Sequence, residues 1–515
     1  MRRALGLIAV MLTAATMMVL AGAAAGTQSA GFSPTREADN FAITLERAKI
    51  YDTLAYQRLL TLSGTANLEH ALAAQAADRG RLFEGDACWQ GENACAGDVR
   101  LYDWASNGYG LVRPVLFTAR DGATISGHIW ATVNGPAKRP GVVITTGSYQ
   151  SDEQMYWYAA QTLAKEGFIV MTFDVQGQGM SDTFGQKPDT YEGFPAQVKG
   201  SPWYDGTEDA INFFLSTAKH PYEPVKSCST GTSHAAKQNE RVEEGLDSAY
   251  NPYWQLLDPK ELGLAGHSFG AAGDSYLAQW DPRVKAVVAW DNLGGPSPDG
   301  STSGDTPPSA CPSDPGFRKT VPITKPGLGI SADYGFPATP NSSLPNPLAK
   351  STESLKYSKA GVDSGEIIIR GGSHVDFSFI PNQAFGASYY GPDIIDWYTT
   401  AWFDRFLKPH DQAAADRMLL SKRWLNFAAE AAIDPLHDGN AFSFYYSSRL
   451  DFHLADGRRW DCEDLRDGCL GMVPTADDGW GVYDYLKIDT TKDASRGPAA
   501  AEAIARGGSW LWWKY

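Results

Sequence analysis

A serine stands between two glycines in the segment Gly266-His267-Ser268-Phe269-Gly270, which matches the pattern G-x-S-x-G. The apolar run 262–266 before it predicts a strand, and the small residues 271–273 after it predict the start of a helix. On a tight turn between a strand and a helix, the serine Oγ is exposed and a backbone N–H lies beside it. We therefore expect Ser268 to be a nucleophile. The alternative is a glycine-rich turn with a purely structural role.

Two aspartates and a histidine further along the chain could activate this serine. They lie at or just beyond the ends of expected strands: Asp291 after 284–290, Asp333 after 326–332 and His374 after 366–371. A serine hydroxyl is a poor nucleophile until a neighbouring imidazole takes its proton, and a carboxylate holds that imidazole in the required tautomer. These residue types therefore predict nucleophilic attack on an acyl carbonyl, as in ester hydrolysis.

The elements that must position these residues alternate between strands and helices from about residue 112 to residue 408. Val112 to Thr132 predicts a hairpin with its turn at 120–122. Short apolar, β-branched runs predict buried strands at 141–146, 168–174, 262–266, 284–290, 326–332 and 366–371. Periodic apolar residues and end signals predict helices from Ser151 to Gly167, at 206–219 and at 393–407. This alternation predicts an α/β fold with a mostly parallel sheet covered by helices on both faces.

The order of these elements resembles the α/β-hydrolase fold over residues 112–408. The segment DVQGQGMSD (174–182) is similar to the D-x-x-G-x-G-x-S segment after the fourth strand of that family. GHSFGAAG (266–273) resembles platelet-activating-factor acetylhydrolases and bacterial polyester hydrolases, and IIIRGGSHVDFS (367–378) is similar to the histidine loop of the former. The resemblance implies a serine esterase that requires no metal and no cofactor.

The resemblance also selects among the histidines, because the base follows the serine in this family. The candidates are His374, His410, His437 and His453. The last three lie at or beyond the closing helix 393–407, whereas His374 lies in a glycine-flanked loop where the resemblance places the base. His374 is therefore the expected base, and the alternative is a loop histidine with a capping role.

Two candidates remain for the acid that orients the histidine. Asp291 directly ends a strand, 23 residues after Ser268, and resembles the acetylhydrolase arrangement. Asp333 follows the next strand. In the family's usual pattern, the carboxylate in this region follows a glycine by three or four residues. Ser331 takes the place of that glycine, and Asp333 follows it by only two residues, so Asp333 comes one or two positions early. Asp291 is expected to be the acid, and Asp333 is the alternative.

Two backbone N–H groups are expected to bind the oxyanion of an acyl intermediate. One belongs to Phe269, directly after the serine. The other lies in the turn after the strand 141–146, where resemblance to polyester hydrolases, which carry an aromatic residue there, indicates Tyr149. The alternative is that Tyr149 only packs the loop.

The first 25 residues have the layout of a secretory signal peptide. Arg2 and Arg3 precede an uncharged apolar run at 4–20, and the small residues 21–25 follow it. The alternative is an uncleaved membrane anchor, because such a run approaches spanning length. We therefore expect a secreted protein, extracellular or in the cell envelope, without a stable membrane anchor. The expected division is a signal peptide (1–25), an N-terminal helical extension (26–111), a catalytic domain (112–408) and a C-terminal accessory region (409–515).

Six cysteines agree with export to an oxidising compartment. Two pairs are close in the sequence, Cys88–Cys95 and Cys462–Cys469, which leaves Cys228–Cys311 as a long-range pair. Among the many connectivities that six cysteines allow, we expect these three disulfides. No C-x₂₋₄-C spacing with a nearby histidine indicates zinc.

The composition narrows the classes of partner. The 515 residues carry a formal net charge of −16, and such a chain lacks the basic surface that binding to nucleic acid or anionic membranes requires. The expected partner is a small-molecule or polymeric ester, and the oligomeric state stays open. Two other functions remain: a secreted acyltransferase or peptidase with the same residues, and a non-catalytic binding protein on a hydrolase scaffold.

Overall fold

The computed structural model describes the chain between residues 32 and 476 with several gaps. The described residues are 32–46, 73, 76–82, 104, 110–148, 152–189, 191–194, 201–295, 320–378, 390–424 and 439–476. Within these ranges, no helix is both long enough and apolar enough to cross a membrane. The expected signal peptide, most of the expected N-terminal extension and residues 477–515 lie outside the described residues.

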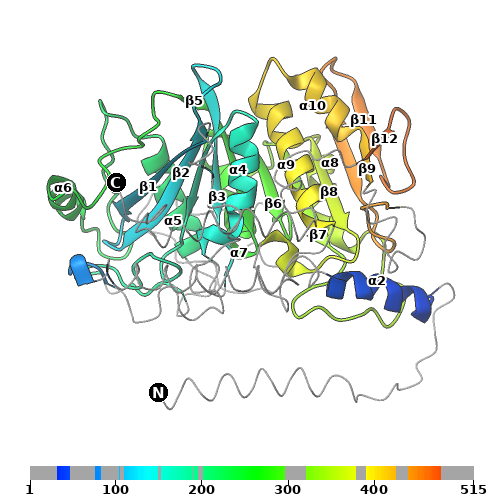
Figure 1. Ribbon diagram of the computed structural model, residues 1–515, viewed down its shortest axis with the longest axis horizontal. Coiled ribbons are helices and arrows are strands. Elements are labelled where there is room, and N and C mark those ends of the chain that lie inside the picture. Colours follow the sequence, from blue (N-terminus) through cyan, green and yellow to red (C-terminus); the bar gives the residue numbers. More distant parts are fainter. Residues whose placement is uncertain are drawn as a thin grey trace, which may run out of the picture.

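A ten-stranded mixed sheet runs through the molecule in the order β1-β2-β4-β3-β5-β6-β7-β8-β10-β11 (Figure 1). The six strands from β4 to β8 in this order are parallel, and the strands at both edges are antiparallel. The strands are β1 (Gly110–Thr118), β2 (Thr124–Thr132), β3 (Arg139–Thr145), β4 (Ile169–Phe173), β5 (Leu257–His267), β6 (Val284–Trp290), β7 (Gly327–Ala332), β8 (Ser364–Ile369), β10 (Arg449–His453) and β11 (Arg459–Cys462). The expected α/β class with a mostly parallel centre is therefore observed.

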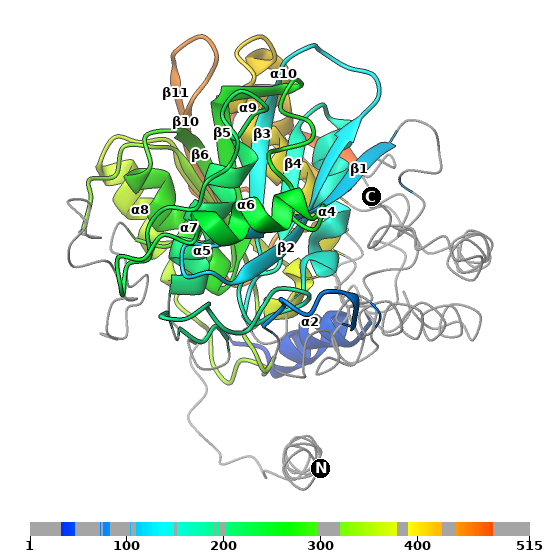
Figure 2. The same cartoon turned by 90° about the vertical axis from the view of Figure 1, so that its left-hand side faces the viewer.

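Helices cover both faces of this sheet. Helices α4 (Trp157–Lys165) and α9 (Gly391–Leu407) pack on one face, and α5 (Ser201–Phe214) and α7 (Phe269–Trp280) pack on the other. Figure 2 shows α5 and α7 on one side of the strands and α4 on the other. Alternate residues of a strand point to opposite faces, so Val142 belongs to the core under α4 and Val143 to the core under α5. This is why the central strands are apolar on both faces over their buried stretches, such as 141–144 and 262–266.

Four further helices among the described residues surround these layers. They are α2 (Pro34–Glu46), α6 (Ala235–Glu243), α8 (Thr352–Lys359) and α10 (Gln412–Leu419), with 3-10 turns η3 (Glu153–Tyr156), η4 (Ala349–Ser351) and η5 (His374–Phe377). Helix α6 lies in a polar stretch for which the sequence predicted no element. Its inner face is held by polar contacts: Arg241 pairs with Asp78 and Asp247 at 2.7 Å, and Gln238 accepts a hydrogen bond from the Thr118 N–H. Such a helix lacks the apolar stripe from which helices are predicted.

The chain beyond residue 408 continues the same sheet. Strand β10 pairs antiparallel with β8, and β11 pairs antiparallel with β10. Two further short strands, β9 (Ser421–Trp424) and β12 (Val473–Ala476), pair parallel with each other. The expected boundary at residue 408 therefore does not separate the sheet, and part of the region 409–515 is an extension of the main domain.

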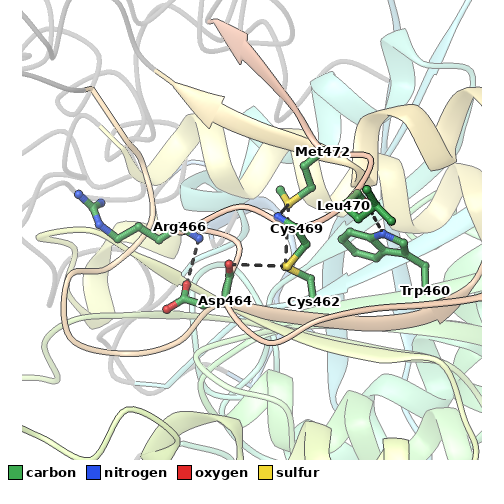
Figure 3. The surroundings of a disulfide bond; sticks show 7 residues. All are labelled: Trp460, Cys462, Asp464, Arg466, Cys469, Leu470 and Met472. Atoms are coloured by element: carbon green, nitrogen blue, oxygen red, sulfur yellow. Dashed lines mark hydrogen bonds between the residues drawn. A yellow bond between two sulfur atoms is a disulfide. The ribbon is translucent and has the colours of Figure 1, made fainter.

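A disulfide joins Cys462 and Cys469, as the spacing predicts (Figure 3). The loop that it closes is also held by a hydrogen bond from Trp460 Nε1 to the Leu470 carbonyl, 2.8 Å long. Cys228 is disulfide-bonded as well. The pairings Cys88–Cys95 and Cys228–Cys311 therefore stay predictions, because Cys88, Cys95 and Cys311 are not among the described residues.

Candidate active site

Three expected site residues meet at the carboxyl edge of the sheet. Ser268 follows β5, Asp291 follows β6, and His374 is the first residue of η5, a few residues after β8. His374 Nε2 lies 3.1 Å from Ser268 Oγ, and His374 Nδ1 lies 2.5 Å from Asp291 Oδ2. With its proton on Nδ1, the imidazole donates to Asp291 and accepts the hydroxyl hydrogen of Ser268. This is the arrangement in which an imidazole can take a proton from a serine.

The backbone at Ser268 has φ 57° and ψ −118°, a conformation that few non-glycine residues adopt. Its neighbours must be small for this turn to close. A Cβ on Gly270 would lie 2.5 Å from the Thr145 carbonyl oxygen, and a Cβ on Gly266 would lie 2.4 Å from Asp274 Oδ2. The two glycines of the motif therefore allow β5, β3 and α7 to approach closely enough to present the serine hydroxyl at the sheet edge.

The charge of Asp291 is stabilised by its partner. Burial opposes ionisation of this carboxyl, but the hydrogen bond and the attraction of His374 outweigh it and lower the pKa of Asp291. Its backbone is also in the left-handed region, with φ 47°, which aspartate tolerates better than most residues. An ionised carboxylate at this position can hold the imidazole and stabilise its protonated form.

Asp333, the alternative acid, has other partners. It follows β7, between β6 and β8 in the sheet, but its Oδ2 accepts hydrogen bonds of 2.8 Å from Asn40 Nδ2 and from the Gly371 N–H. Its Oδ1 accepts a hydrogen bond from the Ser443 hydroxyl. Between Asp333 and His374, both of them described residues, no hydrogen bond or ion pair is present. The geometry therefore favours Asp291 as the acid that contacts the imidazole.

Of the two residues expected to bind an oxyanion, Phe269 and Tyr149, only Phe269 is a described residue. Phe269 is the first residue of α7, so its N–H belongs to the helix N-terminus beside Ser268. The loop after β3 is held by side chains that donate to its carbonyls: Trp203 Nε1 to Thr146 O at 3.0 Å and Gln178 Nε2 to Gly147 O at 2.7 Å. Tyr149 lies outside the described residues, and its role stays a prediction.

The segment at 174–182, which carried part of the resemblance, is built around a buried carboxyl. Asp174 accepts hydrogen bonds from the N–H groups of Glu153, at 2.7 Å, and of Met180, at 2.8 Å. Burial and the nearby Glu153 raise the pKa of Asp174 well above its usual range. The segment thereby fixes Gln178, whose amide holds the loop after β3 in place.

His267, the residue before the serine, takes part in a buried hydrogen-bond chain that the sequence did not indicate. The Gly147 N–H donates to the Tyr156 hydroxyl at 3.1 Å, and that hydroxyl lies 2.8 Å from His267 Nδ1. His267 Nε2 lies 2.9 Å from the carbonyl oxygen of His374. The neutral tautomer with hydrogen on Nε2 satisfies all three contacts. This chain of hydrogen bonds thus links the loop after β3 to the backbone of His374.

The environment of His267 predicts a pH dependence of stability. Burial and the nearby charge of His374 lower the pKa of His267 to about 3. The unfolded chain binds this proton near pH 6.5, so the contribution of His267 to stability falls as the pH drops from about 6.5 toward 3. For His267→Gln, we expect the loss of unfolding free energy between about pH 7 and about pH 5 to be about 2 kcal/mol smaller than in the wild type.

Urea unfolding at the two pH values measures this difference. The matched control is His220→Gln, which removes an exposed histidine and should keep the wild-type pH dependence. An identical pH dependence in His267→Gln and the wild type would show that His267 titrates normally in the folded protein.

Among the described residues, no group of three or more histidine, cysteine, aspartate or glutamate side chains is arranged to hold a metal ion. Comparisons with protein-family models and with curated proteins found no match to this chain. The function is therefore inferred from the chemistry of the site.

Proposed function

We propose that the protein is a secreted serine hydrolase that cleaves carboxylic esters through an acyl-enzyme. The observation that carries this proposal is the position of the His374 ring, which bridges Ser268 Oγ and Asp291 Oδ2 with one nitrogen each. A histidine that only capped a loop would have no reason to contact a serine on a strained turn and a carboxylate 83 residues away.

The geometry supports a two-step reaction. Ser268 Oγ attacks the ester carbonyl carbon while its proton passes to His374 Nε2, and Asp291 stabilises the imidazolium. The imidazolium then gives this proton to the alcohol oxygen as the carbon–oxygen bond breaks, which leaves the acyl group on Ser268. Water repeats the sequence: His374 takes its proton, the hydroxyl attacks the acyl carbon, and the acid leaves as Ser268 regains its hydrogen. We assign the Phe269 N–H, at the start of α7, to binding of the oxyanion.

Within the α/β class we propose the α/β-hydrolase fold for this chain. The supporting features are the serine on a turn from a strand to a helix and the chain order Ser268, Asp291, His374, which is the order of that fold. Secretion is supported by the layout of residues 1–25 and agrees with the Cys462–Cys469 disulfide, since such bonds persist mainly outside the reducing cytosol.

A panel of chromogenic esters with short to long acyl chains, together with a polyester film, tests the proposal. We expect hydrolysis of at least one of these, with free acid as the product, and no hydrolysis by His374→Gln. Addition of an alcohol or amine acceptor separates hydrolysis from transfer, because a transferase would form the acceptor's ester or amide. Failure of the wild-type protein on every ester would contradict the proposal.

A further inference from the structure

The carboxylate of Asp333 joins three distant parts of the chain beside the histidine loop, residues 370–374. Asn40 comes from helix α2, Gly371 from the histidine loop itself, and Ser443 from the segment before β10. Asp333 is buried, with 3% of its surface exposed. Burial raises its pKa, and the hydrogen bonds that it accepts oppose that rise. A buried carboxylate that accepts three hydrogen bonds fixes its donors relative to one another.

Helix α2 also holds the histidine loop directly. The Thr44 hydroxyl donates a 2.6 Å hydrogen bond to the Gly371 carbonyl, so both peptide groups of Gly371 are bound, one by Asp333 and one by α2. Gly371 has φ +59°, and a Cβ there would lie 2.4 Å from the Cβ of Ile43. The helix therefore packs on the loop at a position where only glycine fits. Figure 1 shows α2 at the edge of the molecule next to β7 and β8.

The other end of α2 is attached to the chain after β7. Glu37 accepts hydrogen bonds from the Tyr334 hydroxyl, at 3.1 Å, and from the Asn341 N–H. Asn40 donates a second hydrogen bond to the Tyr334 hydroxyl, and the Tyr334 N–H donates to the Gly372 carbonyl, both at 3.0 Å. The contacts of α2 with Tyr334 thus lead through one residue to Gly372, and its contact through Thr44 leads directly to Gly371.

We propose that helix α2 and Asp333 position His374 for catalysis by fixing the loop that carries it. Thr44, Asn40 and Asp333 are positioning residues that act through Gly371, three residues before His374. This inference rests on the proposed esterase function. His374 must keep its ring between Ser268 and Asp291, and small displacements of a catalytic group cost up to about a hundredfold in rate. The contacts on the other side of the loop, from His267 to the His374 carbonyl, complete the support.

The test compares three variants of the full chain. Thr44→Val keeps the shape of the side chain and removes the hydrogen bond to Gly371. Thr44→Ser keeps the hydroxyl. Thr35→Val makes the same change as the first variant at an exposed position of the same helix. We expect Thr44→Val to lower kcat on a chromogenic ester by about ten- to a hundredfold with little change in KM. Thr44→Ser should restore most of kcat, and Thr35→Val should match the wild type.

A spectroscopic measurement makes the outcome independent of turnover. In ¹H NMR, the Nδ1 proton that His374 shares with Asp291 should give a far-downfield resonance, assigned by its loss in Asp291→Asn. We expect Thr44→Val and Asn40→Ala to shift or broaden it while circular dichroism stays unchanged. An inactive wild-type protein that shows these resonance changes would refute the esterase function but support the positioning role. Normal kcat and an unchanged resonance in folded Thr44→Val and Asn40→Ala would overturn the positioning role alone.

Discussion

Replacement of Ser268 by alanine is expected to lower the rate of ester hydrolysis by about four to six orders of magnitude, because the attacking oxygen is lost. The fold should be retained. Alanine fits the same turn, and the glycines that let β3, β5 and α7 approach one another are unchanged. Steady-state rates on a chromogenic ester, with circular dichroism as the measure of folding, check the prediction. A folded Ser268→Ala variant that keeps a tenth of the wild-type activity would refute the assignment of Ser268.

The second large effect is expected at the acid. Asp291→Asn should lower kcat by about 10⁴ and leave KM nearly unchanged, since an amide facing Nδ1 favours the imidazole tautomer that cannot accept the serine proton. Steady-state kinetics on one chromogenic ester, at the same pH for the variant and the wild type, measure both constants. Stability should change less than activity, because the carboxamide has nearly the shape of the carboxylate.

Asp333→Asn is the matched comparison for this variant, since it makes the same chemical change at the neighbouring strand end. We expect Asp333→Asn to lower kcat by about tenfold or less. Asp333 contacts Asn40, Gly371 and Ser443, so it acts on His374 only through the loop. If kcat instead fell by about 10⁴ in Asp333→Asn and only mildly in Asp291→Asn, the acid of the site would be Asp333, after the later strand.

Strand ends, residue chemistry and the resemblance to α/β-hydrolases together predicted the three residues that meet at the sheet edge. The reason is local: Ser268, Asp291 and His374 each follow a strand with a clear apolar pattern, and the carboxyl ends of parallel strands lie at the same edge. The same reasoning placed Asp333 at that edge, where it is found. The direction in which its side chain points could not be predicted, because it depends on Asn40, which is 293 residues away in the sequence.

The contacts that support the site were not predictable for a related reason. The supporting contacts are individual hydrogen bonds between different segments, made by His267, Tyr156 and Thr44. Such bonds leave no periodic pattern in the sequence. A polar residue at the end of an otherwise apolar strand was the one available signal for His267. Helix α2 lies within the expected helical extension 26–111, but apolar spacing did not indicate its start at Pro34, because its first turn is fixed by contacts of Glu37 with Tyr334 and Asn341.

Covalent capture of the nucleophile tests the central claim most directly. The folded wild-type protein is incubated with an aryl phosphonate ester, which reacts with serines that an adjacent imidazole activates, and is examined by intact-mass analysis and peptide mapping. We expect one phosphonyl group per chain, attached to Ser268, with none in Ser268→Ala and a strongly reduced rate in His374→Gln. A folded protein that takes up no phosphonyl group, or that carries it on another residue, would contradict the proposal that Ser268 is the nucleophile of a serine hydrolase.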